Sequence, residues 1–413
     1  MALRIEDYGL IGDLHTAAIV GRDGSIDWLC LPRFDSGACF AALLGEARHG
    51  RWKLAPVDPI RAQSWHYRDN TLVLEREIET EYGACRVVDF MPRRSGEAAH
   101  IVRIVEGLRG QVLIRSELVP RFDYGEAVPW IEQTEDGMSA AAGPDALVLR
   151  TPASLQEKDE GIVAEFTVTA GETLPLVLSW HPSHLPPPAL IDPVAALEET
   201  EGLWREWSGR CTYQGEWRDA VLRSVITLKA LTYGPTGGIV AAPTTSLPEA
   251  IGGERNWDYR FCWLRDAALS VQALLRTGYV AEAAAFREWL LRAVTGHPRQ
   301  AHIMYGLAGE RRLTEYTLAA LPGYEGSAPV HIGNAASEQF QLDIFGELAD
   351  AFFLGVELLN IPPEPSRWQN TLLALEVVEE VWKQPDEGIW EVRGPRRHFT
   401  HSKVMAWVAF DRA

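Results

Sequence analysis

Two kinds of residue pattern follow one another along this chain, and their order limits what it can fold into. Residues 1–190 hold short apolar runs at strand spacing, broken repeatedly by Gly and Pro. Beyond the stiff linker His181–Pro188 (HPSHLPPP), apolar residues recur at three- and four-residue steps, which is the period of a helix face. At 413 residues the chain exceeds one ordinary core, so the sequence predicts two domains of different class.

The first domain is predicted to be an antiparallel β-sandwich over residues 1–190. Its apolar runs flank turn signals such as GRDGS at 21–25 and the segment Gly107–Gly110. Strands of this length and spacing are typical of antiparallel sheets that pack face to face. The expected strands are Ala17–Val20, Ile26–Leu31, Thr71–Ile78, Ala84–Phe90, Ile101–Val105, Gln111–Leu118, Ala146–Arg150, Ile162–Thr169 and Thr173–Trp180.

The second domain is predicted to consist of paired helices. Asp192 and Pro193 supply an N-cap and a first helical residue, so a helix is expected over Asp192–Trp207. Helix pairs joined by long Gly- and Pro-rich loops indicate an α/α barrel or toroid whose loops build the functional site. We place a helical linker at 191–212 and the barrel at 213–413. The helices within the barrel are expected at 216–233, 264–277, 280–295, 336–359, 366–383 and 401–413.

The last predicted helix has no stop signal before Ala413. Its apolar residues Val404, Trp407 and Phe410 have no predicted partner, and fewer helices precede it than a closed barrel of paired helices needs. The sequence therefore predicts a barrel that is incomplete in this chain.

Charge and cysteine content narrow the classes of partner. With 57 acidic and 39 basic residues the net charge is −18, which argues against nucleic acid or an anionic membrane surface. The N-terminus (MALRIEDYGL) does not resemble a signal peptide, and no run approaches the eighteen apolar residues of a membrane span. The five scattered cysteines predict reduced thiols in a cytoplasmic protein. No HExxH or Walker motif occurs and no GxGxxG follows a strand, so neither a metal nor a cofactor is expected.

The stretch Gly252–Leu269 (GGERNWDYRFCWLRDAAL) concentrates aromatic and charged residues. Aromatics occupy every second position up to Trp263, which predicts an extended run with one aromatic face, and a helix is expected from Leu264. Arg265 and Asp266 therefore lie where loop meets helix. An aromatic wall beside an Arg–Asp pair suits a sugar, whose CH faces stack on rings while its hydroxyls bind the charged groups. The alternative is a buried ion pair beneath an aromatic core.

Two further places hold polar groups that could act on a sugar. Glu391 has an apolar neighbour on each side in a predicted loop. Desolvation there would raise its pKa and let the carboxyl donate a proton to a glycosidic oxygen. An ordinary loop glutamate is the alternative. Gln339 and Asp343 lie one turn apart on the predicted helix 336–359, from which they either reach a sugar or only cap and solvate the helix.

Taken together, these motifs resemble those of glycoside hydrolase family 15, which holds the glucoamylases and bacterial trehalases. The resemblance lies in GGERNWDYRFCWLRDA, in GYEGSAPVHIGNAASEQFQLDIFGE and in GIWEVRGPRRHFTHSKVMAWVAFDRA. The opening, YGLIGDLHTAAIVGRDGSIDWLCLPRFDS, resembles the N-terminal domain of the trehalase-like branch. The resemblance implies a multidomain β + α fold, a β-sandwich linked to an (α/α)6 barrel. It also implies inverting, exo-acting release of glucose from non-reducing ends.

The resemblance also implies roles for particular residues. Arg265 and Asp266 match the WxRD pair that grips the hydroxyls of the terminal glucose. Tyr259 and Trp263 match aromatic residues of the same subsite, and Trp390 joins them as a candidate for substrate binding.

The same comparison of motifs implies that Glu391 is the general acid. Glucoamylases often carry a second Glu directly after it, where this chain has Val392, and this difference favours a trehalase-like pocket. Inversion needs a base about 6.5–9.5 Å from the acid. The resemblance places that base, a late Glu of the barrel, beyond residue 413.

Three functions stay open on this evidence. The expected one is hydrolysis of a small α-glucoside such as trehalose or a malto- or isomalto-oligosaccharide. A glucan-binding remnant without turnover is the second, because the base is not identified in these 413 residues. A disaccharide phosphorylase of the same architecture is the third. The sequence leaves the oligomeric state, including a homo-oligomer, open.

Overall fold

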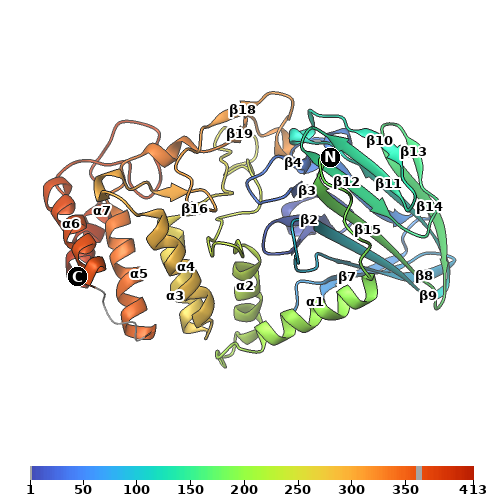
Figure 1. The fold of residues 1–413 in the computed structure, drawn as a ribbon, viewed down its shortest axis with the longest axis horizontal. Helices are drawn as coiled ribbons and strands as arrows, with labels where there is room; N and C mark the ends of the chain where they lie inside the picture. Colours follow the sequence, from blue (N-terminus) through green and yellow to red (C-terminus); the bar gives the residue numbers. More distant parts are fainter. Residues whose placement is uncertain (1, 360–364) are drawn as a thin grey trace. The chain divides into compact units, whose positions relative to one another are not determined.

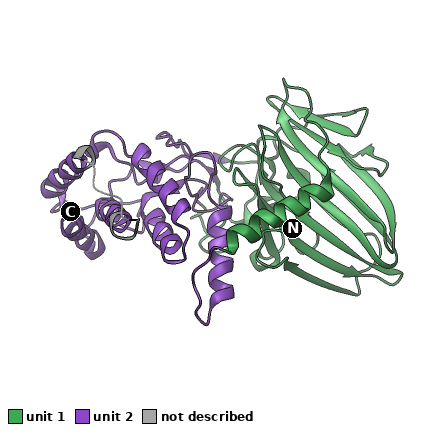
Figure 2. Ribbon diagram, turned by 60° about the horizontal axis from the view of Figure 1, so that its bottom comes forward, with its two compact units in different colours: residues 1–209, 246–256, 318–330 green, residues 210–245, 257–317, 331–413 purple. Residues whose placement is uncertain are grey.

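The computed structural model describes residues 2–359 and 365–413. It contains two compact units, which Figure 2 distinguishes by colour. Unit 1 comprises residues 1–209, 246–256 and 318–330, and unit 2 comprises residues 210–245, 257–317 and 331–413. The predicted domain boundaries at 190 and 212 stay a prediction.

Unit 1 is built around a large antiparallel sheet, as the strand pattern predicted. The main path runs in the order β1-β2-β3-β5-β9-β15-β12-β11-β10, with the other strands pairing beside it (Figure 1). The strands are β1 Tyr8–Gly12, β2 Ala17–Gly21, β3 Ser25–Cys30, β4 Ala38–Phe40, β5 Arg51–Pro56, β6 Ala62–Tyr67, β7 Leu74–Glu79, β8 Gly83–Phe90, β9 Ala99–Val119, β10 Trp130–Gln133, β11 Met138–Ala142, β12 Asp145–Arg150, β13 Gln156–Lys158, β14 Gly161–Thr169 and β15 Thr173–Pro182.

The long strand β9 joins the two halves of the sheet. Its first half pairs with β8 and β15, and its second half pairs with β5 and β14. Ile101 from the first half and Val112 from the second belong to one buried cluster, so the two halves enclose a common core. Fully burying an aliphatic side chain of this kind contributes about 1.5–3 kcal/mol.

The turn predicted at Gly107–Gly110 is wrong, because β9 continues through it. The glycines serve close approach and bending instead. A Cβ atom at Gly107 would lie 1.9 Å from the carbonyl oxygen of Thr169, and Gly110 has a φ of +59°. The register with β8 also shifts at this point, between Ala84 and Cys85. The glycines therefore mark the place where β9 changes partners. A turn and a bulge both favour glycine, so the sequence alone does not distinguish them.

Helix α1 (Pro193–Ser208) covers one face of the sheet in unit 1. The predicted cap is confirmed, since the Asp192 side chain accepts hydrogen bonds from the backbone N–H groups of Val194 and Ala195. Leu197 of α1 packs into a second cluster with Phe90 and other residues of the sheet.

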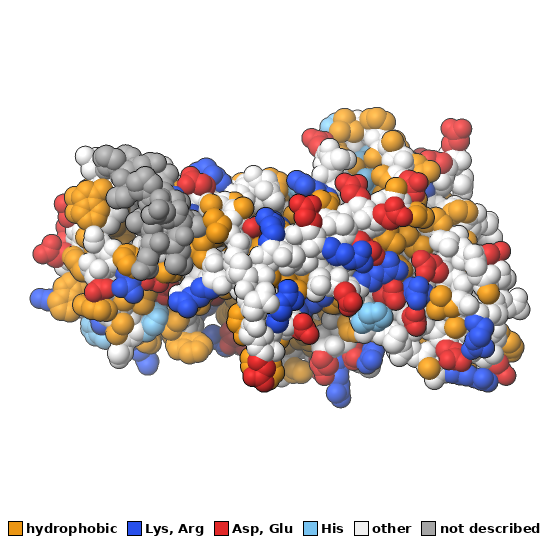
Figure 3. Space-filling model, turned by 90° about the horizontal axis from the view of Figure 1, so that it is seen from below, with side chains coloured by type: hydrophobic (Ala, Val, Ile, Leu, Met, Phe, Trp, Pro, Cys, Tyr) orange, Lys and Arg blue, Asp and Glu red, His pale blue; other side chains and the backbone are white. Residues whose placement is uncertain are grey.

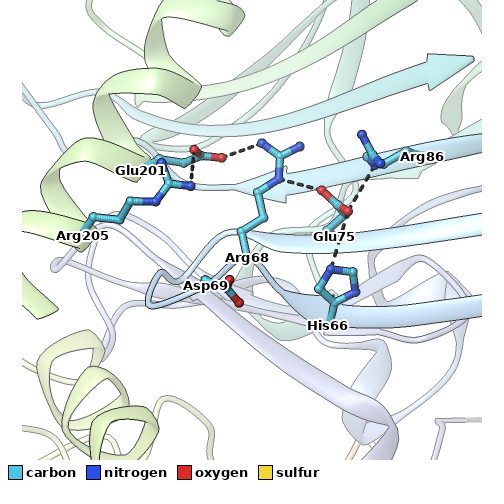
Figure 4. Close-up of a pocket in the computed structure, with 7 residues that line it drawn as sticks. All are labelled: His66, Arg68, Asp69, Glu75, Arg86, Glu201 and Arg205. Atoms are coloured by element: carbon cyan, nitrogen blue, oxygen red, sulfur yellow. Dashed lines mark hydrogen bonds and ion pairs between the residues drawn. The ribbon is translucent and has the colours of Figure 1, made fainter. Parts of the chain in front are cut away.

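Ion pairs attach α1 to the same sheet (Figure 4). Arg68 donates to Glu201 of α1 at 2.5 Å and to Glu75 of β7 at 2.7 Å. Arg86 also pairs with Glu75, at 3.1 Å. A hollow of about 390 Å³ lies here, lined by His66, Arg68, Asp69, Glu75, Arg86, Glu201 and Arg205. Because these arginines and glutamates neutralise one another, the cluster holds the helix rather than presenting a patch of one charge.

Unit 2 is helical, as predicted for the second half of the chain. Helices α3, α4 and α5 lie side by side in it (Figure 1). Its helices are α2 Arg218–Ala230, α3 Leu264–Arg276, α4 Val280–Ala293, α5 Asp343–Leu359, α6 Pro365–Val381 and α7 Thr400–Arg412. The short strand β16 (Cys262–Trp263) pairs with β17 (Met304–Tyr305), and two further short strands are β18 Tyr316–Leu318 and β19 Val330–Ile332.

The helix predicted over 336–359 is wrong at its start. Residues Ala335–Glu338 form a single 3₁₀ turn, and α5 begins only at Asp343. The intervening N–H groups bond outside the helix: Phe340 donates to a carboxylate oxygen of Glu387 at 2.9 Å and Leu342 to one of Asp386 at 3.0 Å. Side chains distant in sequence therefore replace the carbonyl acceptors that a helix would have supplied.

Figure 3 shows a face of the molecule on which acidic and basic side chains are interspersed. Among the residues that the structure describes, none of the helices combines the length and apolar character that a membrane crossing requires. The five cysteines are all buried and free of disulfide bonds.

Candidate active site

The extended run before α3 separates polar from aromatic side chains. Asp258 and Arg260 are fully buried, and they form a two-pronged pair at 2.9 and 2.7 Å. The Asp258 carboxylate also accepts from the N–H of Gly333 at 3.0 Å, and its backbone carbonyl accepts from the Asn334 amide at 3.1 Å. Asp258 and Arg260 therefore form a buried ion pair that anchors the run.

The neighbouring pair, Arg265 and Asp266, lies at the open end of the same run, in the first turn of α3. The two side chains are 3.1 Å apart, and 18% of the Arg265 side chain and 49% of the Asp266 side chain are exposed. Arg265 also donates to the backbone carbonyl of Ile389 at 3.1 Å and lies 3.7 Å from a carboxylate oxygen of Glu391. The fold thus brings together two motifs that lie 125 residues apart in the sequence (391 − 266 = 125).

Glu391 is held by an indole. The Trp263 Nε1–H donates to Glu391 Oε1 at 2.6 Å, and the Trp263 ring lies 5.4 Å from that of Tyr259. Burial raises the pKa of Glu391 above its ordinary value, while the Trp263 hydrogen bond and the Arg265 charge offset part of the rise. A carboxyl with a raised pKa stays protonated to higher pH than an ordinary carboxyl and can donate that proton.

The structure brings most of the predicted site residues together. Trp390 differs, because 74% of it is exposed and it points its bulk to solvent rather than into a packed wall. The clustered residues are Tyr259, Trp263, Arg265, Asp266 and Glu391.

The backbone at Glu391 is unusual for a side-chain-bearing residue. Its φ is +51°, in the left-handed region, and Gly388 three residues earlier has a φ of +68°. A left-handed residue other than glycine costs about 1–2 kcal/mol, so its surroundings must hold it. One such restraint is the Gln339 side-chain amide, which donates to the Glu391 carbonyl at 3.3 Å. Gln339 therefore contacts the backbone of Glu391, although it does not share a helix with Asp343.

Two residues near Glu391, Arg393 and Glu315, were not predicted from the sequence. Arg393 donates to both carboxylate oxygens of Glu315, at 2.7 and 2.6 Å, and its guanidinium lies 3.7 Å above the centre of the Trp257 ring. Arg393 follows Glu391 by two positions, which is a signal that could have been noticed. Nothing in the sequence links Glu315, which is 78 residues away, to this loop.

Acidic groups of α5 lie behind Arg265. The Asp343 side chain is fully buried, and burial raises its pKa, partly offset by the charge of Arg265. Burial and the neighbouring Asp343 raise the pKa of Glu347 to about 7. The Arg265 guanidinium therefore lies among carboxyl groups from two helices and the Glu391 loop.

A hollow of about 220 Å³ lies in unit 2, beside this cluster rather than within it. Neither this hollow nor the charged one on the sheet is lined by Glu391. Among the described residues, no group of three or more His, Cys, Asp or Glu side chains is arranged to hold a metal ion. The candidate site is therefore defined by contacts among charged and aromatic side chains, and not by cavity volume.

The site thus holds a largely buried carboxyl, a partly exposed Arg–Asp pair and two aromatic rings, which are groups that can bind a sugar. Comparison with known families agrees. The model of the glycosyl hydrolases family 15 matches residues 215–413, and the trehalase-like N-terminal model matches residues 1–181. This chain belongs to glycosyl hydrolase family 15.

Curated relatives are trehalases from several organisms. The chain is 35% identical to the trehalase of Mycolicibacterium smegmatis, over 99% of this chain and 65% of that protein. It is 33% identical to the trehalase of Thermoplasma acidophilum, over 96% and 68%, and 35% identical to trehalase 1 of Sulfolobus acidocaldarius, over 99% and 71%. The chain thus spans about two thirds of the length of the curated relatives it matches.

A solved structure of a provisionally assigned kojibiose phosphorylase from the human microbiome has a TM-score of 0.47 and 11% identity. The match covers 97% of this chain and 62% of that one. This likeness is too low to carry any argument about activity.

Proposed function

We propose that this chain carries the residues that bind the sugar and donate the proton in a trehalase-type α-glucoside hydrolase. The observation that carries the proposal is the Glu391 carboxyl. It is largely buried, bonded by the Trp263 indole at 2.6 Å and placed 3.7 Å from Arg265. Similarity to curated trehalases over nearly the whole chain supports trehalose as the first substrate to test.

In this proposal Arg265 and Asp266 hold the hydroxyls of the terminal glucose. A guanidinium offers donors in a fixed fork, and a carboxylate accepts from hydroxyls, so the pair can bind two neighbouring hydroxyl groups. Asp266 is half-exposed and thus has room to exchange a partner, and the Tyr259 and Trp263 rings offer an apolar wall for the sugar.

The reaction would be a single displacement with inversion. Glu391 gives its proton to the glycosidic oxygen as the bond from C1 to that oxygen breaks. Water forms the new bond to C1 from the opposite face, and a base takes the proton of that water. We place this base in the family's later barrel segment, beyond residue 413, and assign none of the described carboxyls to it. The complete (α/α)6 barrel is part of the same proposal.

The test compares glucose release by the gene's full product on trehalose, maltose and isomaltose. Release mainly from trehalose is expected. The Glu391→Gln variant should lose at least 10²-fold in turnover, which is the low end of what general acid catalysis contributes, while substrate binding by calorimetry is retained. The matched control is Glu379→Gln, an exposed glutamate of α6, which should leave both unchanged.

Two results would redirect the proposal. Equal loss of binding and turnover in Glu391→Gln would remove its role as acid. Normal sugar binding without any glucose release by the full product would favour the glucan-binding alternative, and release of glucose 1-phosphate only in the presence of phosphate would favour a phosphorylase.

A further inference from the structure

We propose that Glu315 and Arg393 form a clamp that positions the Glu391 carboxyl for proton donation. The clamp is defined as the two-pronged Glu315–Arg393 pair together with the Trp257 ring on which Arg393 stacks. The inference rests on the acid role proposed above and assigns a positioning role to residues that do not themselves transfer the proton.

Hydrogen bonds and ring stacking together hold the Arg393 guanidinium. Two N–H groups of its guanidinium donate to the two Glu315 oxygens at 2.7 and 2.6 Å, which sets the plane of the fork. The guanidinium then lies 3.7 Å from the centre of the Trp257 ring, which sets its height. A lysine could reproduce the charge but neither the fork nor the stack.

The clamp is anchored to the rigid part of unit 2. A Glu315 oxygen accepts from the Ala335 N–H at 3.0 Å, and Arg393 approaches the Asn334 side-chain oxygen at 3.4 Å. The Asn334 amide donates to the backbone carbonyl of Asp258 at 3.1 Å, and Asp258 belongs to the fully buried pair with Arg260. Displacement of the Arg393 side chain is therefore resisted by a chain of bonds that ends in the core.

This restraint reaches Glu391 because the two residues are close in the chain. Arg393 lies two residues after the acid, a span of at most about 7 Å between Cα atoms. The backbone at Glu391 is left-handed and requires support, which the clamp supplies from its C-terminal side. On the N-terminal side, Arg265 holds the carbonyl of Ile389 at 3.1 Å. Glu391 therefore lies between Arg265, which binds the backbone before it, and Arg393, which restrains the backbone after it.

The clamp's charges also act on the acid. Only 17% of the Glu315 side chain and 31% of the Arg393 side chain are exposed. Burial alone would raise the pKa of Glu315, but the bonds from Arg393 and Ala335 outweigh it and hold that pKa below its ordinary value, so the clamp stays ionised at neutral pH. The charged groups that face Glu391 are Arg265, Asp266 and Arg393, and the two arginines lower its pKa.

The test uses substitutions that separate shape from charge in the gene's full product. Arg393→Lys keeps the charge and loses the fork. Arg393→Gln loses both, and Glu315→Gln leaves the Arg393 charge uncompensated. The control is Arg109→Lys on the sheet of unit 1, which alters an exposed Arg–Glu pair with a separation of 2.8 Å. The readouts are kcat and KM for trehalose from pH 4 to 9, and hydrogen–deuterium exchange of the segment 386–397.

A positioning role predicts a distinct pattern. Arg393→Lys should lower kcat by about 10–100-fold with little change in KM, because misplacing a catalytic group by about 1 Å costs up to 10²-fold. The high-pH limb of the plot of kcat against pH should not move in this variant. In Arg393→Gln the limb should move to higher pH, and in Glu315→Gln to lower pH, since the first removes a cation near the acid and the second removes its counter-charge. Amide exchange in the segment should accelerate in all three and stay unchanged in Arg109→Lys.

Two results would overturn the clamp. One is a fall in kcat that is the same in all three variants with no opposite displacement of the limbs, which a merely structural role would give. The other is unchanged amide exchange in the segment 386–397. The exchange measurement needs no turnover, so it tests the clamp even if the wild-type protein releases no glucose and the proposed function fails.

Discussion

Two Arg–Asp pairs lie within nine residues of this chain, between Asp258 and Asp266, and they differ in burial. Asp258 and Arg260 are fully buried, and Asp258 bonds to three different residues through side chain and backbone. Arg265 and Asp266 lie at the end of the same run with their side chains partly exposed and one bond between them. The first pair has no capacity left for a ligand, whereas the second has it.

The difference shows how a stable anchor and an adaptable site can be built from the same residue types. A buried pair keeps its geometry because losing either partner leaves an uncompensated charge in the interior. A half-exposed pair contributes little to stability, since solvent screens it, but its groups are free to take new partners. Each of the following predictions tests one side of this contrast.

The largest effect is expected on stability at the buried pair. Asp258→Asn leaves the Arg260 charge unpaired, so the free energy of unfolding should fall by about 3–5 kcal/mol, measured by denaturant titration. Asp266→Asn is the matched control at the open pair and should change it by less than about 0.5 kcal/mol. Equal losses of unfolding free energy in the two variants would contradict the difference between the buried and the open pair.

For sugar recognition, an effect is expected at the open pair. Asp266→Asn should lower kcat/KM on trehalose by about 10²-fold in the full gene product, because hydrogen bonds to a charged group contribute about 1.5–3 kcal/mol. Steady-state kinetics on the correctly folded variant measures the change. An unaltered kcat/KM would show that this carboxylate does not grip substrate.

Trp263→Phe tests the hydrogen bond that the Trp263 indole donates to Glu391. The variant keeps the aromatic wall but loses the N–H that favours the charged form of Glu391, so the pKa of Glu391 should rise further. A general acid works while protonated, and its activity falls as pH rises through its pKa. The high-pH limb should therefore move to higher pH, with kcat lower by about tenfold for one lost bond to a charged group. A high-pH limb that stays in place would contradict the assignment of Glu391 as the general acid.

The smallest effect is expected from the carboxyl behind Arg265. The pKa of Glu347 is raised to about 7 from an ordinary value of 4.5, so stability is present below the ordinary value and lost as pH rises toward 7. Glu347→Gln removes the cost of burying that charge. The thermal midpoint should rise by a few degrees at pH 8 and stay unchanged at pH 4, as measured by calorimetry. A rise of the same size at both pH values would mean that ionisation of Glu347 is not the cause.

The parts of the fold that local chemistry decides could be predicted from the sequence. The Asp192 cap, the start of a helix at Leu264 and the strand-then-helix order are examples. The errors lie where distant groups compete with local ones. Gly107 and Gly110 resemble a turn, but β9 pairs with strands on both sides and continues. Residues 339–342 follow a helical pattern, but the carboxylates of Glu387 and Asp386 accept from the N–H groups of Phe340 and Leu342.

The candidate site divides in the same way. Arg265, Asp266 and Glu391 were selected by residue type and motif, and the structure brings them together, while their roles stay predictions. Sequence spacing could not show which of two Arg–Asp pairs is buried, since both lie in the same aromatic stretch. The Glu315–Arg393 clamp could not be predicted either, because its partners meet only through the fold.

The most direct test of the central claim asks whether Glu391 supplies the proton to the leaving group. Fluoride departs from C1 with far less need of a proton than a sugar hydroxyl, so α-glucosyl fluoride bypasses a missing acid. We would compare its hydrolysis with that of trehalose in the wild-type and Glu391→Gln full gene products. The account predicts that the variant loses at least about 10²-fold on trehalose and keeps most of its rate on the fluoride. Equal losses on the two substrates would contradict it.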